Sequence, residues 1–469
     1  MGNCVKNLSL ENIAAACGGR LFCNGRESAE KVVSDIVTDN RKVTKGALFV
    51  AIKGNRVDGH DFIPSAYEAG AVCVISEKEI ATDKAFIVVE NSLHAIKKIA
   101  AFYRGNLDIK VVGITGSVGK TSTKEMIYSV LSEKYNVLKT EGNFNNELGL
   151  PLTVFRIREE HEIAVLEMGI SDFGEMTRLT EIAKPDVAVI TNIGLCHLEN
   201  LKSRDGILKA KTEIFTGLSK DGAIILNGDD DKLITVNEYD GIKPVYYHVC
   251  DADQTGANIY ADNIVSEGIK GIKSTLHYYD SSIEVRINIP GIHMVYNAMA
   301  ALCVGKAFGL SDEAIKCGIE KLQPVNGRNN IIEGDRITVI DDCYNANPVS
   351  MKAGIDVLAY AEKRKVAILG DMFELGTREC DLHADMGKYL LNSNTDVIVL
   401  CGGLMYHAYT YLTEHNCEKE FYYFEKIEDL MLKLDDIIKE DDTILVKASH
   451  GMEFIKIIRK LEKELLLHK

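Results

Sequence analysis

The stretch VVGITGSVGKTSTKEMI, residues 111–127, constrains the fold more than any other part of the chain. A short apolar run leads through three glycines into a helical pattern. Such a strand, turn and helix place backbone N–H groups and a helix N-terminus around an anion. The glycines alone also fit a tight turn with positive φ, but Gly-Lys-Thr in this context favours nucleotide binding. The predicted phosphate-binding residues are Gly116, Ser117, Val118, Gly119, Lys120, Thr121 and Ser122.

Two side chains give this loop its expected chemistry. Lys120 supplies a positive charge for the β- and γ-phosphates, and Thr121 supplies a hydroxyl for magnesium. The strict phosphate-loop pattern requires a glycine five residues before Gly119, where this chain has Ile114. This departure argues against the ordinary kinases and GTPases.

The remaining sequence predicts an α/β protein with three domains. Apolar strands at 163–169, 186–194 and 222–230 alternate with helical stretches, which indicates a parallel sheet covered on both faces. The alternation restarts after a linker at 323–330, as in a second doubly wound unit. The expected domains are residues 1–107, 108–325 and 326–469. Two nucleotide-type domains joined by a linker predict a ligand-binding cleft between them.

The net charge, the apolar content and the cysteine spacing argue against several classes of protein. The net charge of -15 argues against a protein that binds nucleic acid through its phosphate backbone. No run reaches the roughly 18 apolar residues of a membrane span, and no signal peptide is visible. The twelve cysteines form no Cys-x-x-Cys pair, so we expect reduced thiols and no zinc site. A cytoplasmic monomer is expected.

Two polar residues follow central strands at the edge where ligands of such sheets bind. Glu167 ends the strand at 163–169, and His197 follows the strand at 186–194. Together with Thr121 they are candidate magnesium ligands. Each residue alone is ambiguous, since a single histidine more often has a structural role.

Five segments resemble one protein family, the ATP-dependent Mur ligases. They are TGSVGKT (115–121), DNRKVTKGALFVAIKGNRVDGHDFI (39–63), GNFNNELGLPLT (142–153), DDCYNANPVSM (341–351) and LGDMFELG (369–376). The resemblance is to the branch that joins D-alanyl-D-alanine to UDP-N-acetylmuramoyl-tripeptide. It implies a small N-terminal UDP-binding domain, a central ATPase-like parallel sheet and a C-terminal Rossmann-like domain. It also implies an amide ligase that forms an acyl phosphate and releases ADP, phosphate and the pentapeptide precursor of peptidoglycan.

The resemblance also implies roles for individual residues. The catalytic set is Lys120, Glu167, His197, Lys211 and Arg328, and the ATP-side set adds His293, Asn297, Asp342, Tyr344 and Asn345. Two magnesium ions are expected, with Lys211 as a further ligand if it is carbamylated to N6-carboxylysine. An ordinary helix lysine is the alternative for Lys211, and a cap or turn role is the alternative for Asn297.

Further residues are expected on the substrate side. They are Thr38, Asp39 and Arg41 for the uridine diphosphate, with Lys53, Asn55 and His60 continuing the patch, then Asn143, Asn145, Asn146 and Asn347, and Lys447 and Ser449 for the dipeptide carboxylate. The chain departs from the family pattern at Asn40, which replaces a serine, and at His450, which follows Ser449. Turn formation is the alternative for several of these residues.

Two other functions remain open at this stage. One is a different ligase of the superfamily, although more than 100 residues precede the phosphate loop, which argues against the folate branch. The other is a nucleotide-binding regulator that closes on ATP without ligating anything. The sequence leaves the third peptide residue open between diaminopimelate and lysine.

Overall fold

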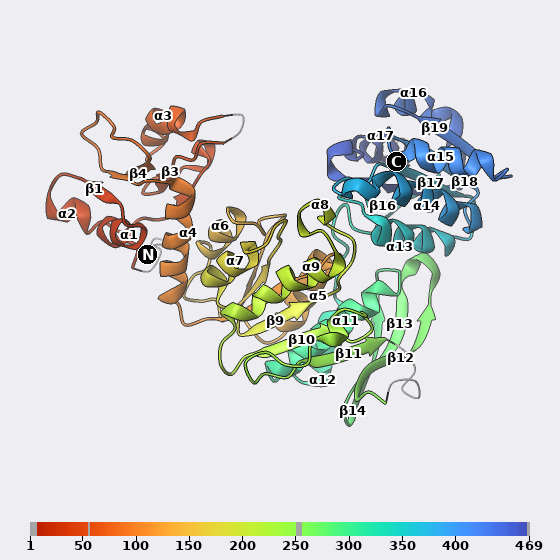
Figure 1. The fold of residues 1–469 in the computed structure, drawn as a ribbon, viewed down its shortest axis with the longest axis horizontal. Coiled ribbons are helices and arrows are strands. Elements are labelled where there is room, and N and C mark those ends of the chain that lie inside the picture. Colours follow the sequence, from red (N-terminus) through yellow and green to blue (C-terminus); the bar gives the residue numbers. More distant parts are fainter. Residues whose placement is uncertain (1–6, 55–56, 250–255, 467–469) are drawn as a thin grey trace.

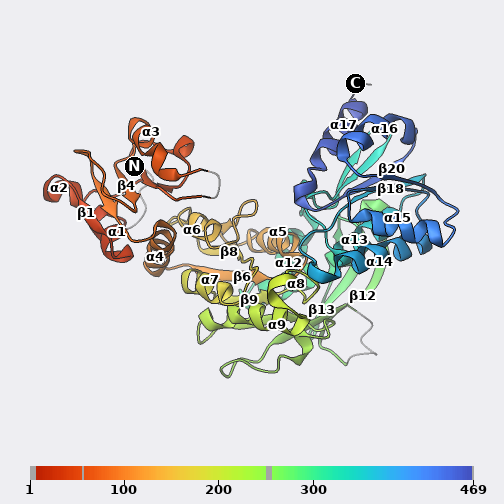
Figure 2. The same ribbon diagram turned by 45° about the horizontal axis from the view of Figure 1, so that its top comes forward.

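The computed structural model describes residues 7–54, 57–249 and 256–466. Three β-sheets follow one another along the chain and form three lobes (Figure 1). The N-terminal and C-terminal lobes lie at opposite ends of the central lobe in both views (Figure 2). The predicted α/β class is confirmed.

The N-terminal lobe is built on a five-stranded sheet of order β1-β5-β4-β3-β2. Its β1 runs antiparallel to β5, and the other pairs are parallel. The strands are β1 (Arg20–Phe22), β2 (Ile36–Val37), β3 (Leu48–Val50), β4 (Cys73–Ser76) and β5 (Phe86–Val88), and the first helices are α1 (Leu10–Cys17), α2 (Gly25–Ala29) and α3 (Ile63–Glu68).

Helix α4 (Ser92–Gly105) connects this lobe to the central one. The helix begins where the Asn91 side chain accepts a backbone N–H bond, a favourable N-cap. Near its end, the buried Arg104 donates to the carbonyls of Ala183 and Ile109 in the central lobe. These bonds hold α4, and with it the N-terminal lobe, against the central lobe.

The central lobe contains a nine-stranded sheet of order β14-β13-β12-β11-β10-β9-β6-β8-β7. Its strands are β6 (Lys110–Thr115), β7 (Val137–Lys139), β8 (Ile163–Glu167), β9 (Val187–Ile190), β10 (Ala223–Asn227), β11 (Val245–Val249), β12 (Ile259–Ser266), β13 (Ile272–Tyr278) and β14 (Ser281–Ile287). Its helices are α5 (Lys120–Leu131), α6 (Gly149–Val154), α7 (Glu175–Ala183), α8 (Leu198–Leu201), α9 (Arg204–Thr212), α11 (His293–Ala307) and α12 (Asp312–Glu320).

Both faces of the parallel part of this sheet are covered, as predicted. Successive residues of a strand point to opposite faces. Val111 belongs to the core that includes α7 and α9, whereas Val112 belongs to the core that includes α5, α11 and α12. These strands are apolar along their whole length because both of their faces are buried.

An antiparallel extension was not expected from the sequence. Strands β12, β13 and β14 pair antiparallel and lengthen the parallel sheet at one edge. Their buried and exposed residues alternate, as in Ile272–Tyr278, which is typical of strands with one solvated face. Continuous apolar runs predict strands buried on both faces, and these alternating strands do not have that pattern.

The C-terminal lobe has a six-stranded sheet of order β15-β16-β20-β17-β18-β19. The strands are β15 (Asn330–Glu333), β16 (Thr338–Asp341), β17 (Lys365–Gly370), β18 (Val397–Cys401), β19 (Glu420–Phe424) and β20 (Thr443–Lys447), with helices α13 (Pro348–Ala359), α14 (Glu379–Asn392), α15 (Met405–Glu414), α16 (Ile427–Ile437) and α17 (Ile455–Leu466). All pairs are parallel except β15 with β16. Among the described residues, no helix is both long and apolar enough to cross a bilayer.

Candidate functional site

A cavity of about 1090 Å³ is lined by residues of all three lobes. The N-terminal lobe contributes Ile52, Gly54 and Leu93. The predicted site residues that line it are Ser117, Val118, Gly119, Lys120, Thr121, Ser122, Asn143, Asn145, Asn146, Glu167, His197, His293, Asn297, Arg328, Asp342, Tyr344, Asn345, Asn347 and Lys447. Of the residues that the structure describes, the predicted ones that do not line it are Thr38, Asp39, Arg41, Lys53, His60, Gly116, Lys211 and Ser449.

The phosphate loop has the backbone that its glycines predict. Gly116 has a φ of 153°, and a Cβ there would lie 1.9 Å from the hydroxyl of Thr191. Gly119 has a φ of 84° and directly precedes α5. Between them, the N–H of Val118 donates to the Asn192 side chain at 3.0 Å. The loop is thus shaped by both its own glycines and the residues after β9.

Lys120 is the first residue of α5 and folds back over the loop. Its Nζ donates to the carbonyl of Gly116 at 2.8 Å. This position places the ammonium group beside the N-terminus of α5, where the helix dipole also favours an anion. The arrangement suits a bound phosphate.

Glu167 and Thr121 form the acidic part of the site. Glu167 is buried at the end of β8 and accepts from the Thr121 hydroxyl at 3.0 Å and from the Asn145 amide at 2.8 Å. The backbone N–H of Glu167 donates to Thr140, which fixes the end of the strand. The three predicted residues Thr121, Asn145 and Glu167 are therefore in direct contact.

His197 lies at the same edge of the sheet, at the N-cap of α8. Its Nδ1 lies 2.9 Å from Oε2 of Glu374, a residue of the C-terminal lobe. The contact with His197 lowers the pKa of Glu374. This ion pair crosses the boundary between the central and C-terminal lobes.

Lys211 is buried on α9, with 1% of its surface exposed. Burial lowers the pKa of Lys211 to about 8, with a smaller opposing effect of Cys196 and a still smaller lowering by the charge of Lys120. In the described part of the chain, no three His, Cys, Asp or Glu side chains form a cluster that could hold a metal ion. Oxygen donors are present at Thr121 and Glu167, and oxygen ligands are what magnesium prefers.

The start of α11 supplies His293 and Asn297. Burial lowers the pKa of His293, whose Nε2 lies 3.0 Å from the Asn329 amide nitrogen. Asn297 is buried and accepts from the Thr123 hydroxyl at 2.8 Å, so it also ties α11 to α5. The Asn329 side-chain oxygen is buried without a hydrogen-bond partner within the described residues. A buried acceptor of this kind requires a donor, and Asn329 lines the cavity.

Arg328 and Tyr344 meet at the junction with the C-terminal lobe. The Arg328 guanidinium lies 4.2 Å from the centre of the Tyr344 ring, and the His450 ring lies 5.6 Å away on the same tyrosine. Burial raises the pKa of Tyr344, although Arg328 and a hydrogen bond with Asn143 oppose the shift. Residues of the linker, the central loop and the C-terminal lobe thus converge on one aromatic ring.

Lys447 and Asp342 form a buried ion pair beneath this junction. Lys447 Nζ lies 2.6 Å from Asp342 Oδ2 and also donates to the Asn345 carbonyl at 3.1 Å. Lys447 has 2% of its surface exposed. Lys447, which was expected to hold the dipeptide carboxylate, is therefore already paired with a carboxylate of the protein.

Two more predicted substrate residues hold the C-terminal lobe together. Ser449 is buried, and its hydroxyl accepts from the Phe373 backbone at 2.9 Å instead of lining the cavity. Asn347 caps α13 through a reciprocal pair of bonds with Ser350. Ser449, which was expected to help hold the dipeptide carboxylate, therefore does not line the cavity.

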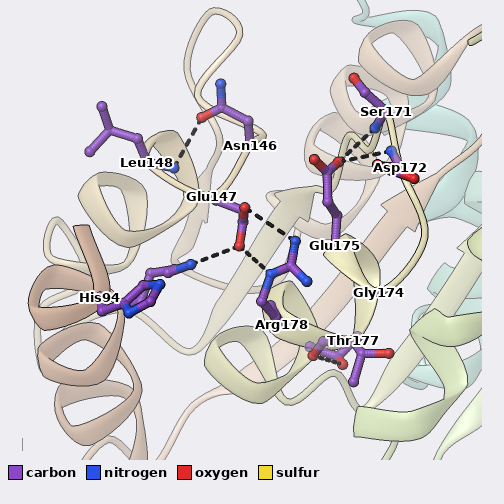
Figure 3. Close-up of polar contacts among 12 residues, drawn as sticks. His94, Asn146, Glu147, Leu148, Ser171, Asp172, Gly174, Glu175, Thr177 and Arg178 are labelled. Atoms are coloured by element: carbon purple, nitrogen blue, oxygen red, sulfur yellow. Dashed lines mark hydrogen bonds and ion pairs between the residues drawn. The ribbon is translucent and has the colours of Figure 1, made fainter. Parts of the chain in front are cut away.

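The loop before α6 is anchored by a partly exposed network of charged residues. Glu147 accepts from Lys97 of α4 at 2.8 Å and from Arg178 of α7 at 2.6 Å, and Figure 3 shows the latter pair face to face. Asn146 accepts from the backbone of Gly149 at 2.8 Å and so begins α6. The asparagine-rich loop is therefore fixed by both lobes that it contacts.

The predicted uridine diphosphate residues lie on a separate exposed surface. Arg41 forms a two-point contact with Asp39 at 2.9 and 2.8 Å, which lowers the pKa of Asp39 to about 2. The Arg41 side chain remains 84% exposed. His60 is buried and paired with Asp58, and Asn55 lies outside the described residues.

Three residues of the site were missed by the sequence analysis. Asn329 stands beside the predicted Arg328, Glu374 lies within the quoted segment 369–376, and Glu147 lies within 142–153. Each was inside a recognised motif, but a charge or amide in a loop gives no sign of its partner in another lobe. Only the fold brings Glu374 to His197 and Glu147 to Lys97.

Comparison with known proteins gives consistent matches along the chain. The family descriptions "Mur ligase family, catalytic domain", "Mur ligase middle domain" and "Mur ligase, glutamate ligase domain" match residues 32–112, 114–305 and 327–450. The UDP-N-acetylmuramoyl-tripeptide–D-alanyl-D-alanine ligase of Bacillus subtilis strain 168 is 37% identical, over 97% of this chain and 98% of the relative. The Escherichia coli K12 ligase of the same name is 33% identical, over 93% and 95%.

Solved structures agree with the sequence matches. A crystal structure of MurF from Acinetobacter baumannii superposes with a TM-score of 0.88 at 32% identity, covering 97% of this chain and 99% of that one. MurF of Thermotoga maritima in complex with ADP gives a TM-score of 0.78 at 31% identity, covering 92% and 97%. The chain belongs to the UDP-N-acetylmuramoyl-tripeptide–D-alanyl-D-alanine ligase (MurF) family of the Mur ligases.

Proposed function

We propose that the chain joins D-alanyl-D-alanine to UDP-N-acetylmuramoyl-tripeptide at the expense of ATP, with an acyl phosphate as intermediate. The observation that carries this proposal is the shared cavity, which places the phosphate loop beside residues of all three lobes. A nucleotide, an acyl donor and an amine can meet only where three binding surfaces converge. We propose that residues 1–107, 108–325 and 326–469 are the domains that supply them.

The reaction explains why phosphate groups and cations must meet in this cavity. A carboxylate is a poor acyl donor, and phosphorylation gives it a good leaving group. The amine of the dipeptide then attacks the acyl carbon, and phosphate departs. The role of the protein is to orient the reactants and stabilise the negative charge of the transferring phosphoryl group. Lys120 and Arg328, both lining the cavity, are the cations we assign to this task.

The magnesium ligands we propose are Thr121, Glu167, His197 and carbamylated Lys211, serving two ions. Thr121 and Glu167 provide oxygen atoms 3.0 Å apart, and both are buried. Bound magnesium would polarise the phosphate oxygens and neutralise their charge. Asn145 supports this part of the site, because its amide holds Glu167 in place.

Carbamylation of Lys211 to N6-carboxylysine is supported by its environment. Carbon dioxide reacts with the neutral amine, and the pKa of about 8 leaves roughly a tenth of the amine neutral at pH 7, far more than in an ordinary lysine. Carbamylation would also replace a buried cation with an anion close to Lys120, whose positive charge disfavours a second ammonium group.

On the nucleotide side we assign His293, Asn297, Arg328, Asp342, Tyr344 and Asn345, and we add Asn329. The unpaired oxygen of Asn329 offers an acceptor for a hydroxyl or amino group of ATP. Arg328 lies on the Tyr344 ring, so its guanidinium is held in one plane where it can contact two phosphate oxygens. Asp342 supports the site indirectly. It forms an ion pair with Lys447 and accepts a hydrogen bond from the backbone N–H of Asn329.

On the substrate side we assign Arg41, with Thr38 and Asp39, to the uridine diphosphate. Asn143, Asn145 and Asn146 then face the sugar-peptide from the central lobe. Asn347 and Lys447 line the C-terminal wall of the cavity, where we place the dipeptide, and Ser449 is buried behind that wall. The exposed His450 lines the cavity beside them. We also propose a monomer that works in the cytoplasm.

The deciding experiment is phosphate release by purified protein with ATP, magnesium, D-alanyl-D-alanine and each UDP-muramoyl-tripeptide. Release that requires every partner, with a pentapeptide product by mass, supports the ligase and identifies the third residue as diaminopimelate or lysine. Lys120→Ala serves as the matched inactive variant. A protein that binds ATP but releases no phosphate with any tripeptide would contradict the proposal and favour the regulator alternative.

A further inference from the structure

An ion pair joins the candidate catalytic edge of the central sheet to the loop after β17. His197 Nδ1 lies 2.9 Å from Glu374 Oε2, and both residues line the cavity. The side chain of His197 is 25% exposed and that of Glu374 is 67% exposed. The pair is therefore accessible from the cavity and not part of a buried core.

The loop that carries Glu374 is held rigidly. Met372 and Leu375 are buried in the C-terminal core on either side of it. The backbone N–H of Met372 donates to His383 at 3.0 Å, which fixes the loop from beneath. Glu374 itself has a φ of 63°, a left-handed conformation that a glutamate adopts only where its surroundings hold it. These contacts aim the carboxylate out of the C-terminal lobe.

The loop that carries His197 is docked on the same lobe. Leu195 packs against the C-terminal core, and a Cβ on Gly194 would lie 3.9 Å from Val349 of α13. His197 also has a left-handed backbone, with a φ of 51°. Both partners thus sit on shaped loops that meet across the lobe boundary.

The carboxylate beside Nδ1 favours one tautomer of the imidazole. A carboxylate oxygen 2.9 Å from Nδ1 repels a lone pair there and attracts an N–H, so the neutral ring favours the hydrogen on Nδ1 and the lone pair on Nε2. Carboxylates next to one ring nitrogen commonly orient a histidine whose other nitrogen binds a metal ion.

We propose that Glu374 is a positioning residue, which holds His197 in the Nδ1–H tautomer and so presents Nε2 to a divalent cation in the cavity. Because Glu374 belongs to the C-terminal lobe, His197 is oriented only while the two lobes are in contact. The metal site is thereby completed by lobe contact. This inference rests on the proposed function, since it assigns His197 to magnesium.

The test uses the full chain and two measurements that need neither tripeptide nor dipeptide. The first is the ¹⁵N NMR spectrum of histidine-labelled protein, with the His197 resonances assigned by their loss in His197→Gln. The second is the affinity for magnesium in the presence of ADP, measured by titration calorimetry. The variants are Glu374→Ala, Glu374→Gln, and the control Glu199→Gln, which removes a charge from the adjacent helix α8.

We expect Glu374→Ala to shift the His197 resonances toward the Nε2–H tautomer and to weaken magnesium binding by about 10- to 100-fold. Glu374→Gln keeps an oxygen acceptor and should retain most of the Nδ1–H tautomer and most of the magnesium affinity. Glu199→Gln should behave as the wild type. Melting temperatures check that all variants are folded.

The proposal requires that Glu374→Ala both shifts the His197 tautomer and weakens magnesium binding. A variant that shows only one of these two changes overturns the proposal. A variant that loses turnover but keeps the wild-type spectrum and affinity would show that the pair only holds the lobes together. Absence of magnesium binding by the wild-type protein would also overturn the proposal. If the protein has no ligase activity, the NMR spectrum and the magnesium affinity can still be measured. A failure of the proposed function can therefore be distinguished from a failure of the proposed role of Glu374.

Discussion

The hydroxyl of Thr121 donates a 3.0 Å hydrogen bond to the carboxylate of Glu167. This bond joins the first turn of α5 to the end of β8, two elements that also pack against each other in the apolar core. Both residues are buried, and Glu167 takes a second bond from Asn145. The phosphate loop and the acidic edge are therefore one connected unit.

Removing the Thr121 hydroxyl should break the link between the phosphate loop and the Glu167 carboxylate. We expect Thr121→Val to lower kcat by about 10²- to 10³-fold, the usual effect of losing one aligned polar group at such a site. Thr121→Ser keeps the hydroxyl and should stay within about tenfold of the wild type. Steady-state kinetics over a range of magnesium concentrations measure both. Equal losses in the two variants would contradict the assigned role.

Lys211 should destabilise the fold when it is not carbamylated. Its pKa is about 8 in the folded chain and 10.5 ordinarily, so the unfolded chain holds the proton more tightly. The free energy of unfolding then rises with pH between these two values, and the penalty is fully present below pH 8. In buffer free of carbon dioxide, Lys211→Met should be more stable than the wild type at pH 7, by roughly 3 kcal/mol at most.

That difference should shrink toward pH 10, as followed by urea denaturation. Lys209→Met on the same helix is the control, because Lys209 is exposed and should show no such pH dependence. Bicarbonate should restore activity to the wild type alone. A Lys211→Met variant with normal turnover would show that Lys211 is an ordinary helix lysine.

Arg41→Ala should raise the KM for the UDP-linked substrate and leave kcat unchanged. The guanidinium is 84% exposed and held by Asp39, so it is placed for a phosphate without being needed by the fold. Loss of hydrogen bonds to a charged group predicts an increase of about 10- to 100-fold. Arg26→Ala removes a similarly exposed arginine of the same lobe and should change nothing. A fall in kcat alone would contradict this assignment.

Glu147→Gln should loosen the contact between the N-terminal and central lobes. Burial raises the pKa of Glu147, but hydrogen bonds from Arg178 and Lys97 outweigh it and lower the pKa below its usual 4.5. The stabilisation is therefore present above pH 4.5 and is lost as the pH falls through the lowered value. At pH 7 we expect a loss of about 1–3 kcal/mol.

Denaturation at pH 7 and at lower pH measures this effect, and the gap between variant and wild type should close as the pH falls. Glu141→Gln, which removes a more exposed carboxylate paired with Arg156, should cost less. An equal loss in both variants would mean that Glu147 has no special role in joining the lobes.

The sequence was sufficient for the α/β class and for the phosphate loop. Glycines at 116 and 119 are required by backbone angles, and a strand before a helix is visible as a change of apolar period. Glu167 and His197 could be placed at one sheet edge because parallel strands end together. These are local features, and local features are readable from the chain.

The partners of the charged residues could not be read in the same way. Lys447 was expected to hold the dipeptide carboxylate, and nothing in the sequence indicates that Asp342, 105 residues earlier, is paired with it. Asn347 was expected on the substrate side; it lines the cavity and also caps α13. A polar side chain in a loop can serve a ligand, a helix end or another lobe, and only the three-dimensional arrangement decides among them.

The position of β20 has a consequence for how the chain is made. This strand pairs with β16 on one side and β17 on the other, although both precede it in the sequence. During synthesis on the ribosome, β16 and β17 therefore emerge with exposed edges that only a later segment can cover. The C-terminal lobe should be the last part to become resistant to proteases, and a nascent chain halted before Thr443 should need chaperones.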